Sequence, residues 1–335
     1  MLKGASISIT TRYFTLAALL LAAGLSCHAF DLQAHRGARA LTPENSLPSF
    51  AQSLGIGVTT LELDIAITKD GVLVVTHDRA LNPDITRGPD GRFIDAPGPV
   101  VSSLSFAEVA RFDVGRIKPG TNYARQFPDQ KAMDGTRIPR LVDLFALVKK
   151  SGNDKVRFAI ETKLSPLAPQ DTLAPEAFAR AVIAAIREAG LASRSSVLSF
   201  DWRTLQVIQR EAPEIPTVYL TIQRGSGDNI GEGKAEPSAW TAGLRYSDYG
   251  SVPKMIKAAG GHTWSAFHLD LTAEKVKEAQ ALGLQVLAWT VNEPARMAAV
   301  FDMGVNGIVT DRPDLLREEM KRRGLALPAM TPVLP

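Results

Sequence analysis

The segment TLELDIAITKDGVLVVTHD, residues 60–78, contains two strand-forming runs separated by a short turn. In the first run apolar and acidic residues alternate, so Glu62 and Asp64 share one face of a strand and aliphatic side chains occupy the other. The Lys-Asp-Gly turn predicts that the second run, residues 72–78, folds back on the first as a hairpin partner. The pattern therefore predicts a strand with acids on an inner face and aliphatic residues packed under helices.

Strand-forming and helix-forming runs alternate along the rest of the chain. Besides 60–68, we predict strands at 31–37, 156–164, 195–200, 216–221, 263–270, 285–291 and 307–311. The clearest helical patterns are at 175–189, 201–212, 272–282, 293–303 and 314–323. This alternation predicts an α/β fold, a (β/α)8 TIM barrel. An open doubly wound sheet is the structural alternative, but no G-x-G-x-x-G follows a strand.

The first helix has a recognisable start signal. Thr42 before Pro43 predicts a hydroxyl cap followed by proline at the first helical position. Glu44 and Asn45 would then open that helix, where polar and acidic residues are favoured, and they could also support a nearby site.

Residues 79–140 interrupt the alternation. The segment is rich in proline and glycine and has only one brief helical run, near 103–112. Connections this long are uncommon in compact domains and are often functional. Because the segment follows a strand, it leaves a barrel at the end where active sites form, and we interpret it as a capping insertion. The barrel domain is expected to span 30–325, with 326–335 as a C-terminal tail.

The composition and charge are those of an ordinary globular protein. The 335 residues carry 38 Lys and Arg against 35 Asp and Glu, a formal net charge of +3. This composition excludes a disordered chain, a collagen-like repeat and a disulfide scaffold. A chain this close to neutral has no general field for nucleic acid, so we expect no nucleic-acid partner. No feature of the sequence indicates an oligomeric state.

The first 29 residues are predicted to be a signal peptide. A positively charged start, residues 1–12, precedes the short apolar run 13–25 (YFTLAALLLAAGL), and small residues at Cys27 and Ala29 resemble a cleavage site. The run is too short for a transmembrane helix, which needs about 20 apolar residues, so we expect no membrane span in the mature chain. Cleavage near Ala29 predicts a periplasmic or secreted protein without cysteine. Lipid anchoring at Cys27 is the alternative, although Gly24 is an imperfect match to that signal.

Acidic residues on two strands point to a cation site. Glu62 and Asp64 share a face of one strand, and Glu161 and Lys163 share a face of the strand at 156–164. Burying several carboxylates together is costly without a cation. Three converging acids would give the oxygen ligands that Ca²⁺ or Mg²⁺ prefers. The alternative is a set of internal salt bridges in which Lys163 is one partner.

Two histidines lie at comparable strand ends. His35 and Arg36 end the first strand, and His77 and Asp78 end the hairpin. Histidine suits acid–base work near neutral pH, and the planar guanidinium of Arg36 fits a phosphate. With a metal to neutralise phosphoryl oxygens, these groups predict cleavage of a phosphodiester, one histidine acting as base and the other as acid.

Several motifs occur together in the order typical of one enzyme family. They are HRGARALTPENSLPSF (35–50), ELD (62–64), TKDGVLVVTHD (68–78), IETK (160–163), WTVN (289–292) and GIVTDRP (307–313). In this set the chain resembles glycerophosphodiester phosphodiesterases from about Asp31 to Gly324. FDVGRIKPGTNYARQFPDQ (112–130) and DGTRIPRL (134–141) resemble the exported, periplasmic bacterial branch. Ser46 is a conservative departure from the threonine frequent at that position.

The resemblance implies a TIM barrel that hydrolyses small-molecule glycerophosphodiesters to sn-glycerol 3-phosphate and an alcohol. By motif position, it implies roles for seven residues: His35 and His77 as the catalytic pair, Glu62, Asp64 and Glu161 as metal ligands, and Arg36 and Lys163 as phosphate-side groups. It also implies a cyclic phosphate formed by the glycerol 2-hydroxyl and then opened by water.

Three further expectations complete the functional hypothesis. Trp289 would line the glycerol pocket as a substrate-binding residue. One divalent cation is expected, Ca²⁺ ahead of Mg²⁺, because the ligands are oxygens and the protein is exported. The alternative functions are a phospholipase D-like enzyme acting on lysophospholipid or sphingolipid, which would need an apolar groove, and a non-catalytic exported solute-binding protein, which would need two similar lobes.

Overall fold

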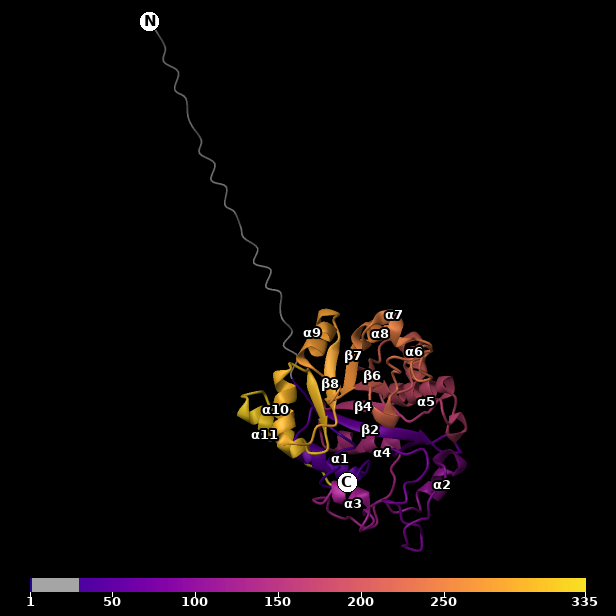
Figure 1. The fold of residues 1–335 in the computed structure, drawn as a ribbon. Helices are drawn as coiled ribbons and strands as arrows, with labels where there is room; N and C mark the ends of the chain where they lie inside the picture. Colours follow the sequence, from indigo (N-terminus) through magenta and orange to yellow (C-terminus); the bar gives the residue numbers. More distant parts are fainter. Residues whose placement is uncertain (2–29) are drawn as a thin grey trace.

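A closed barrel of eight parallel strands forms the centre of the computed structural model, which describes Met1 and residues 30–335 (Figure 1). The strands are β1 (Asp31–Ala34), β2 (Thr60–Ile67), β4 (Arg157–Thr162), β5 (Ser195–Ser199), β6 (Thr217–Thr221), β7 (Thr263–Phe267), β8 (Gln285–Trp289) and β9 (Gly307–Thr310). β1 pairs in parallel with both β2 and β9, which closes the sheet. The predicted (β/α)8 barrel is confirmed. Residues 2–29 of the predicted signal peptide, Cys27 among them, lie outside the described residues.

Helices cover the outside of the barrel (Figure 1). They are α1 (Leu47–Ile56), α4 (Leu141–Lys150), α5 (Pro175–Glu188), α6 (Trp202–Glu211), α7 (Tyr246–Tyr249), α8 (Val252–Ala258), α9 (Ala273–Ala281), α10 (Pro294–Asp302) and α11 (Pro313–Arg322). Leu61, Leu63 and Ile65 on the outer face of β2 are fully buried in the main core, as the alternation predicted. None of the helices in the described part of the chain is both long and apolar enough to cross a membrane.

The predicted hairpin is confirmed in a shortened form. β3 (Leu73–Val75) runs antiparallel to β2, with Val75 opposite Ile65. Because β3 has only three residues, His77 and Asp78 lie in the segment that follows it rather than within the strand. They therefore reach the mouth of the barrel, at the carboxyl end of β2.

The predicted start of the first helix is wrong. α1 begins at Leu47, and the Ser46 hydroxyl caps it by accepting a backbone N–H of the first turn. The Thr42 hydroxyl instead donates to the Ala38 carbonyl. Asn45 has a left-handed backbone with φ of 51°, which a right-handed helix does not contain. Residues 43–45 consequently form a turn beside the barrel mouth and not a helical segment.

The insertion at 79–140 contains two short α-helices, α2 (Phe106–Val109) and α3 (Asn122–Gln126), and one turn of 3-10 helix at Val101–Ser103. The helical run expected at 103–112 is thus a single turn. Buried residues of the insertion, among them Val101 and Val109, pack against Val74 in a small hydrophobic cluster of their own. The insertion therefore has its own anchor on the hairpin and its own contacts to the barrel mouth.

The C-terminal segment 326–335 lies along the helices of the first two barrel units. The Thr331 N–H donates to the Leu54 carbonyl, and Lys150 Nζ donates to the Leu334 carbonyl. Val333 packs against the main core. These contacts fix the segment to α1 and α4 although it contains no helix or strand.

Candidate active site

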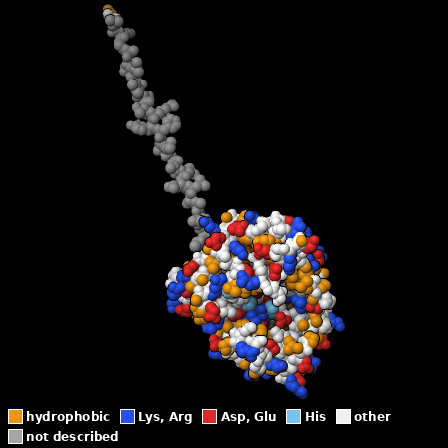
Figure 2. Space-filling model, viewed as in Figure 1, with side chains coloured by type: hydrophobic (Ala, Val, Ile, Leu, Met, Phe, Trp, Pro, Cys, Tyr) orange, Lys and Arg blue, Asp and Glu red, His pale blue; other side chains and the backbone are white. Residues whose placement is uncertain are grey.

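Two connected hollows open at the carboxyl ends of the strands. The smaller, of about 160 Å³, is called the inner cavity, and the larger, of about 610 Å³, the outer cleft. The two hollows share five of their lining residues: His77, Glu161, Lys163, Phe200 and Trp289. Figure 2 shows histidine side chains within a hollow on this face, with acidic and basic side chains around it.

The three predicted metal-binding acids converge in this site. Glu62 and Asp64 project from β2 and Glu161 from the neighbouring β4, where Asp64 and Glu161 are directly paired positions. All three are buried, and one carboxylate oxygen from each lies within 4.8 Å of the other two. The inward face that the alternation predicted for β2 therefore carries a carboxylate cluster.

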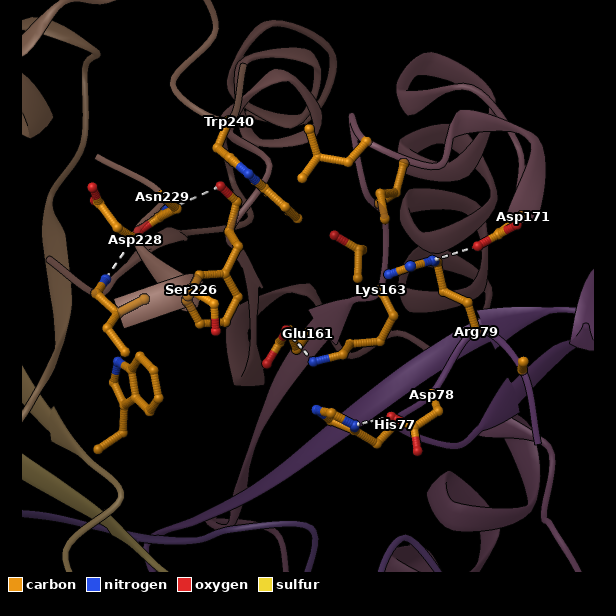
Figure 3. A pocket seen from close by; sticks show the side chains of 18 residues that line it. His77, Asp78, Arg79, Glu161, Lys163, Asp171, Ser226, Asp228, Asn229 and Trp240 are labelled. Atoms are coloured by element: carbon orange, nitrogen blue, oxygen red, sulfur yellow. Dashed lines mark hydrogen bonds and ion pairs between the residues drawn. The ribbon is translucent and has the colours of Figure 1, made fainter. Parts of the chain in front are cut away.

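Basic groups and backbone amides contact this cluster. Lys163 Nζ lies 2.5 Å from Glu161 Oε1 and 3.3 Å from Asp64 Oδ1 (Figure 3). Glu62 Oε2 accepts the backbone N–H of Arg36 at 2.9 Å. Lys163 thus forms the internal salt bridges of the alternative interpretation. It forms them with the same carboxylates that a metal site would use.

The donor set fits a hard divalent cation. Asp64 Oδ1 is buried and accepts no hydrogen bond from any described residue, and its one close charged neighbour is Lys163 Nζ at 3.3 Å. Burial and the nearby carboxylates raise the pKa of Glu62 well above its ordinary value, and burial raises the pKa of Glu161 to about 7. Burial alone would also raise the pKa of Asp64, but Lys163 and Arg36 hold it well below its usual range. The three carboxylates thus carry more negative charge than Lys163 and Arg36 neutralise. A bound divalent cation would neutralise the remainder.

Each predicted catalytic histidine is bound to its own carboxylate. His35 Nδ1 lies 2.6 Å from Asp311 Oδ1, and His77 Nδ1 lies 2.6 Å from Asp78 Oδ1 (Figure 3). An Nδ1 held by a carboxylate fixes the ring and leaves Nε2 for proton transfer. Burial lowers the pKa of His35, and burial together with Arg36 lowers the pKa of His77 to about 4.

The carboxylate behind His35 was not recognised from the sequence. Asp311 follows β9 and is almost fully buried, and its Oδ2 accepts from Asn292 Nδ2 at 2.7 Å. The pairing with His35 holds its pKa at about 2. The available signal is an acid at the end of the predicted strand 307–311, a strand end like those at which His35 and His77 were singled out.

Arg36 is held by carboxylates in addition to lining the inner cavity. Its Nη1 lies 2.8 Å from Glu44 Oε1, and its Nε lies 3.2 Å from Asp64 Oδ2. Glu44 also accepts from Arg39 Nε at 2.8 Å and from the hydroxyl of Tyr123, on α3 of the insertion. These two arginines hold the pKa of Glu44 at about 2 despite burial. That Arg36 binds a phosphate stays a prediction.

Asn45 contacts the carboxylate cluster directly. Its Nδ2 donates to Asp64 Oδ2 at 2.9 Å, and its Oδ1 accepts the Asp64 backbone N–H at 3.3 Å. The left-handed turn at Asn45 makes both contacts possible, and Arg36 has the same backbone sign, with φ of 51°. Positive φ in non-glycine residues is uncommon and is often associated with functional sites. Glu44 and Asn45 thus belong to the site and do not cap a helix.

Trp289 lies on the wall of both hollows, and that it binds the substrate stays a prediction. Its Nε1 donates to the Ser265 carbonyl at 3.0 Å, and its ring meets Phe200 edge to face at 5.4 Å. His268, directly after β7, receives a hydrogen bond from Arg296 Nε and lines neither hollow.

The family model described as the glycerophosphoryl diester phosphodiesterase family matches residues 35–315, nearly the whole barrel. The chain belongs to this family. The enzyme class expected from the motifs, a phosphoric diester hydrolase, is thereby confirmed.

Individual relatives agree with this assignment. A solved structure from Silicibacter pomeroyi, provisionally assigned to the same family, is 35% identical, with a TM-score of 0.78, covering 90% of this chain and 96% of that one. A glycerophosphodiester phosphodiesterase from Caldanaerobacter subterraneus is 28% identical, covering 87% of this chain and 98% of the relative. An Oleispira antarctica phosphodiesterase, solved with its product sn-glycerol-3-phosphate, is 18% identical, with a TM-score of 0.61 and coverages of 86% and 96%, and shares the fold.

The two histidine–carboxylate pairs predict a graded response to amide substitution. Asp311→Asn and Asp78→Asn each remove an anion that favours the imidazolium form, so the limb of the pH–rate profile controlled by each histidine should move to lower pH. The Asp311 side chain is 3% exposed and that of Asp78 is 40% exposed, so we expect the larger shift and the larger loss of kcat, roughly tenfold or more, for Asp311→Asn. Asp302→Asn, at a 68% exposed side chain, is the matched control. Equal profiles for all three variants would contradict this role.

Proposed function

We propose that this protein hydrolyses glycerophosphodiesters to sn-glycerol 3-phosphate and an alcohol. The observation that carries the proposal is the inner cavity itself, where two histidines, each held by a carboxylate, lie beside three clustered acids and a lysine. The names of the relatives and the product found in the Oleispira antarctica protein support the same substrate class.

The two hollows support distinct roles for the histidines. His35 lines only the inner cavity, whereas His77 lines both hollows. We assign the glycerol phosphate half of the substrate to the inner cavity and the leaving alcohol to the outer cleft. His35 Nε2 then accepts the proton of the glycerol 2-hydroxyl as its oxygen attacks phosphorus, and His77 protonates the alcohol oxygen as its bond to phosphorus breaks.

The second step reverses these roles. Water enters from the outer cleft and attacks the five-membered cyclic phosphate, with His77 accepting a proton from the water. His35 returns its proton to the glycerol 2-oxygen as the bond from this oxygen to phosphorus breaks. Both histidines then regain their starting state. Because the substrate phosphate is anionic, its arrival favours the imidazolium form that His77 needs in the first step.

We propose Ca²⁺ as the ion held by Glu62, Asp64 and Glu161, because these ligands are oxygens and the protein is proposed to be exported. When bound there, the ion would neutralise charge on the phosphoryl oxygens. Lys163 contributes a further positive charge beside the phosphate, since the nearby Glu161 and Asp64 outweigh burial and raise its pKa.

The alternative functions find less support. An enzyme acting on lipids predicts a continuous apolar groove. The outer cleft has apolar lining residues such as Leu167, Ile222 and Trp240, but charged side chains of Arg79, Asp171 and Asp228 interrupt them, with Arg79 paired to Asp171 (Figure 3). A solute-binding protein predicts two similar lobes, whereas residues 30–335 form one closed barrel with an insertion.

The first test is release of sn-glycerol 3-phosphate from glycerophosphocholine by the purified protein. We expect release to stop with a chelator and to return with Ca²⁺ more fully than with Mg²⁺. Glu62→Gln should lower kcat at least 100-fold because a neutral ligand weakens the cation site, whereas Glu318→Gln, at an exposed surface position, should have no effect. Unchanged turnover in chelator would contradict the metal site, and absence of release with any ion would contradict the substrate.

Leaving-group dependence tests the assignment of the two histidines. A p-nitrophenyl ester of glycerol phosphate has a leaving group that needs no protonation. His77→Ala should therefore still release p-nitrophenol from this ester in the first step, while the cyclic phosphate accumulates because its opening needs His77 as base. The same variant should lose at least 100-fold with glycerophosphocholine, and His35→Ala should lose both activities. The opposite pattern would exchange the two roles.

We also propose that residues 1–29 direct export to the periplasm, as in the exported branch that the motifs resemble. A charged start, a short apolar run and small residues before the cleavage point support this. Mass spectrometry of the mature protein from a periplasmic fraction should give a chain that begins at Phe30. A lipid-modified chain that begins at Cys27 would contradict cleavage after Ala29.

A further inference from the structure

The inner cavity has two chemically different halves. One half, from β1, β2, β4 and the hairpin, carries the histidines, the acids and Lys163. The other half is built by β5 to β9, and its strand residues are Leu198, Leu220, Ser265, Trp289 and Val309. Four of these five are aliphatic or aromatic, so the hydroxyls of this half come from Ser265 and from Thr290, which directly follows β8.

Ser265 lines this cavity, and its buried hydroxyl has no partner among the described residues. Its neighbours in β7, Trp264 and Ala266, are buried in the outer core, so strand alternation turns Ser265 toward the barrel interior. The residue is fully buried, and its Oγ makes no hydrogen bond with any described residue. Adjacent strands place Leu220 and Leu287 at the paired positions, and neither side chain can supply a partner.

A buried hydroxyl without a partner is costly, and such groups in native proteins call for an explanation. The inner cavity is about 160 Å³, below the roughly 300–1,000 Å³ of pockets that hold drug-sized ligands. It therefore suits a small polyol phosphate. A ligand with its phosphate at the charged half and a hydroxyl at its far end would place that hydroxyl beside Ser265.

We propose that Ser265 binds the primary hydroxyl of the glycerol half of the substrate and thereby selects glycerol over diols that lack it. This inference rests on the proposed function. The glycerol 2-hydroxyl is consumed as the nucleophile next to His35, so the primary hydroxyl is the one left to extend toward the apolar half. There the carbon chain packs against Trp289 and Leu220.

The same residue also positions that wall. The Ser265 carbonyl accepts from Trp289 Nε1, so the indole and the free hydroxyl are held relative to each other by one residue of β7. An analogue without the primary hydroxyl would still contact the indole, but it would leave the Ser265 hydroxyl unpaired. A site built around a hydroxyl discriminates against ligands that lack it for this reason.

The test compares Ser265→Ala with Ser195→Ala. Ser195 is a matched control because it is also buried on a barrel strand with an unpartnered hydroxyl, but it lines a cavity with Asp31 and Gln33 instead of the inner cavity. The substrates are glycerophosphocholine and its analogue with hydrogen in place of the primary hydroxyl. For Ser265→Ala we expect kcat/KM to fall about tenfold with glycerophosphocholine and to stay unchanged with the analogue. Ser195→Ala should keep the wild-type preference.

Binding of sn-glycerol 3-phosphate, measured by calorimetry, gives a readout without turnover. Ser265→Ala should bind it about tenfold more weakly, while its affinity for inorganic phosphate and its melting temperature stay near the wild-type values. An equal loss with both substrates, or no loss with either, overturns the inference. If the wild-type protein releases no product, the calorimetric comparison still decides the role of Ser265 separately from the proposed function.

Discussion

The burial of three carboxylates in one barrel mouth dominates the arrangement around them. Glu62, Asp64 and Glu161 approach within 4.8 Å of one another, where their mutual repulsion and desolvation oppose ionisation. Arg36 and Lys163 lie against the cluster, and Arg36 is itself held by Glu44. The left-handed turns at Arg36 and Asn45 deliver a backbone amide to Glu62 Oε2 and a side-chain amide to Asp64 Oδ2. The local backbone thus follows from the need to compensate buried charge.

The strand-borne part of this site could be predicted because it depends on local alternation. A period of two places Glu62 and Asp64 on the inner face of β2, and the same rule puts Glu161, in β4, on the same side as Lys163, which directly follows that strand. The closed barrel follows from the alternation of strands and helices, which the sequence displays from residue 31 to 323 outside the insertion at 79–140. These inferences need no knowledge of which distant segments touch.

The parts that escaped prediction depend on contacts between distant segments. Asp311 lies 276 positions from His35, and nothing local indicates their pairing. Thr42 has a suitable side chain for a helix cap. However, residues 43–45 form the turn that brings Asn45 to Asp64, so the cap is Ser46 and α1 begins at Leu47. Ser265 reads as an unremarkable residue in an apolar strand. Its position opposite the charged half of the cavity, on which the role proposed for its hydroxyl depends, follows only from closure of the barrel.

The hydrogen bond from the Tyr123 hydroxyl to Glu44 limits which segments can be exchanged between family members. This contact joins the insertion to the loop that carries both site arginines, and Arg39 also lies over the ring of Phe127 at 4.4 Å. A chimaera that received a different insertion would leave the Glu44 and Arg39 contacts incomplete. Segments 36–44 and 122–127 therefore form a single exchangeable unit, although 77 residues separate them in the chain.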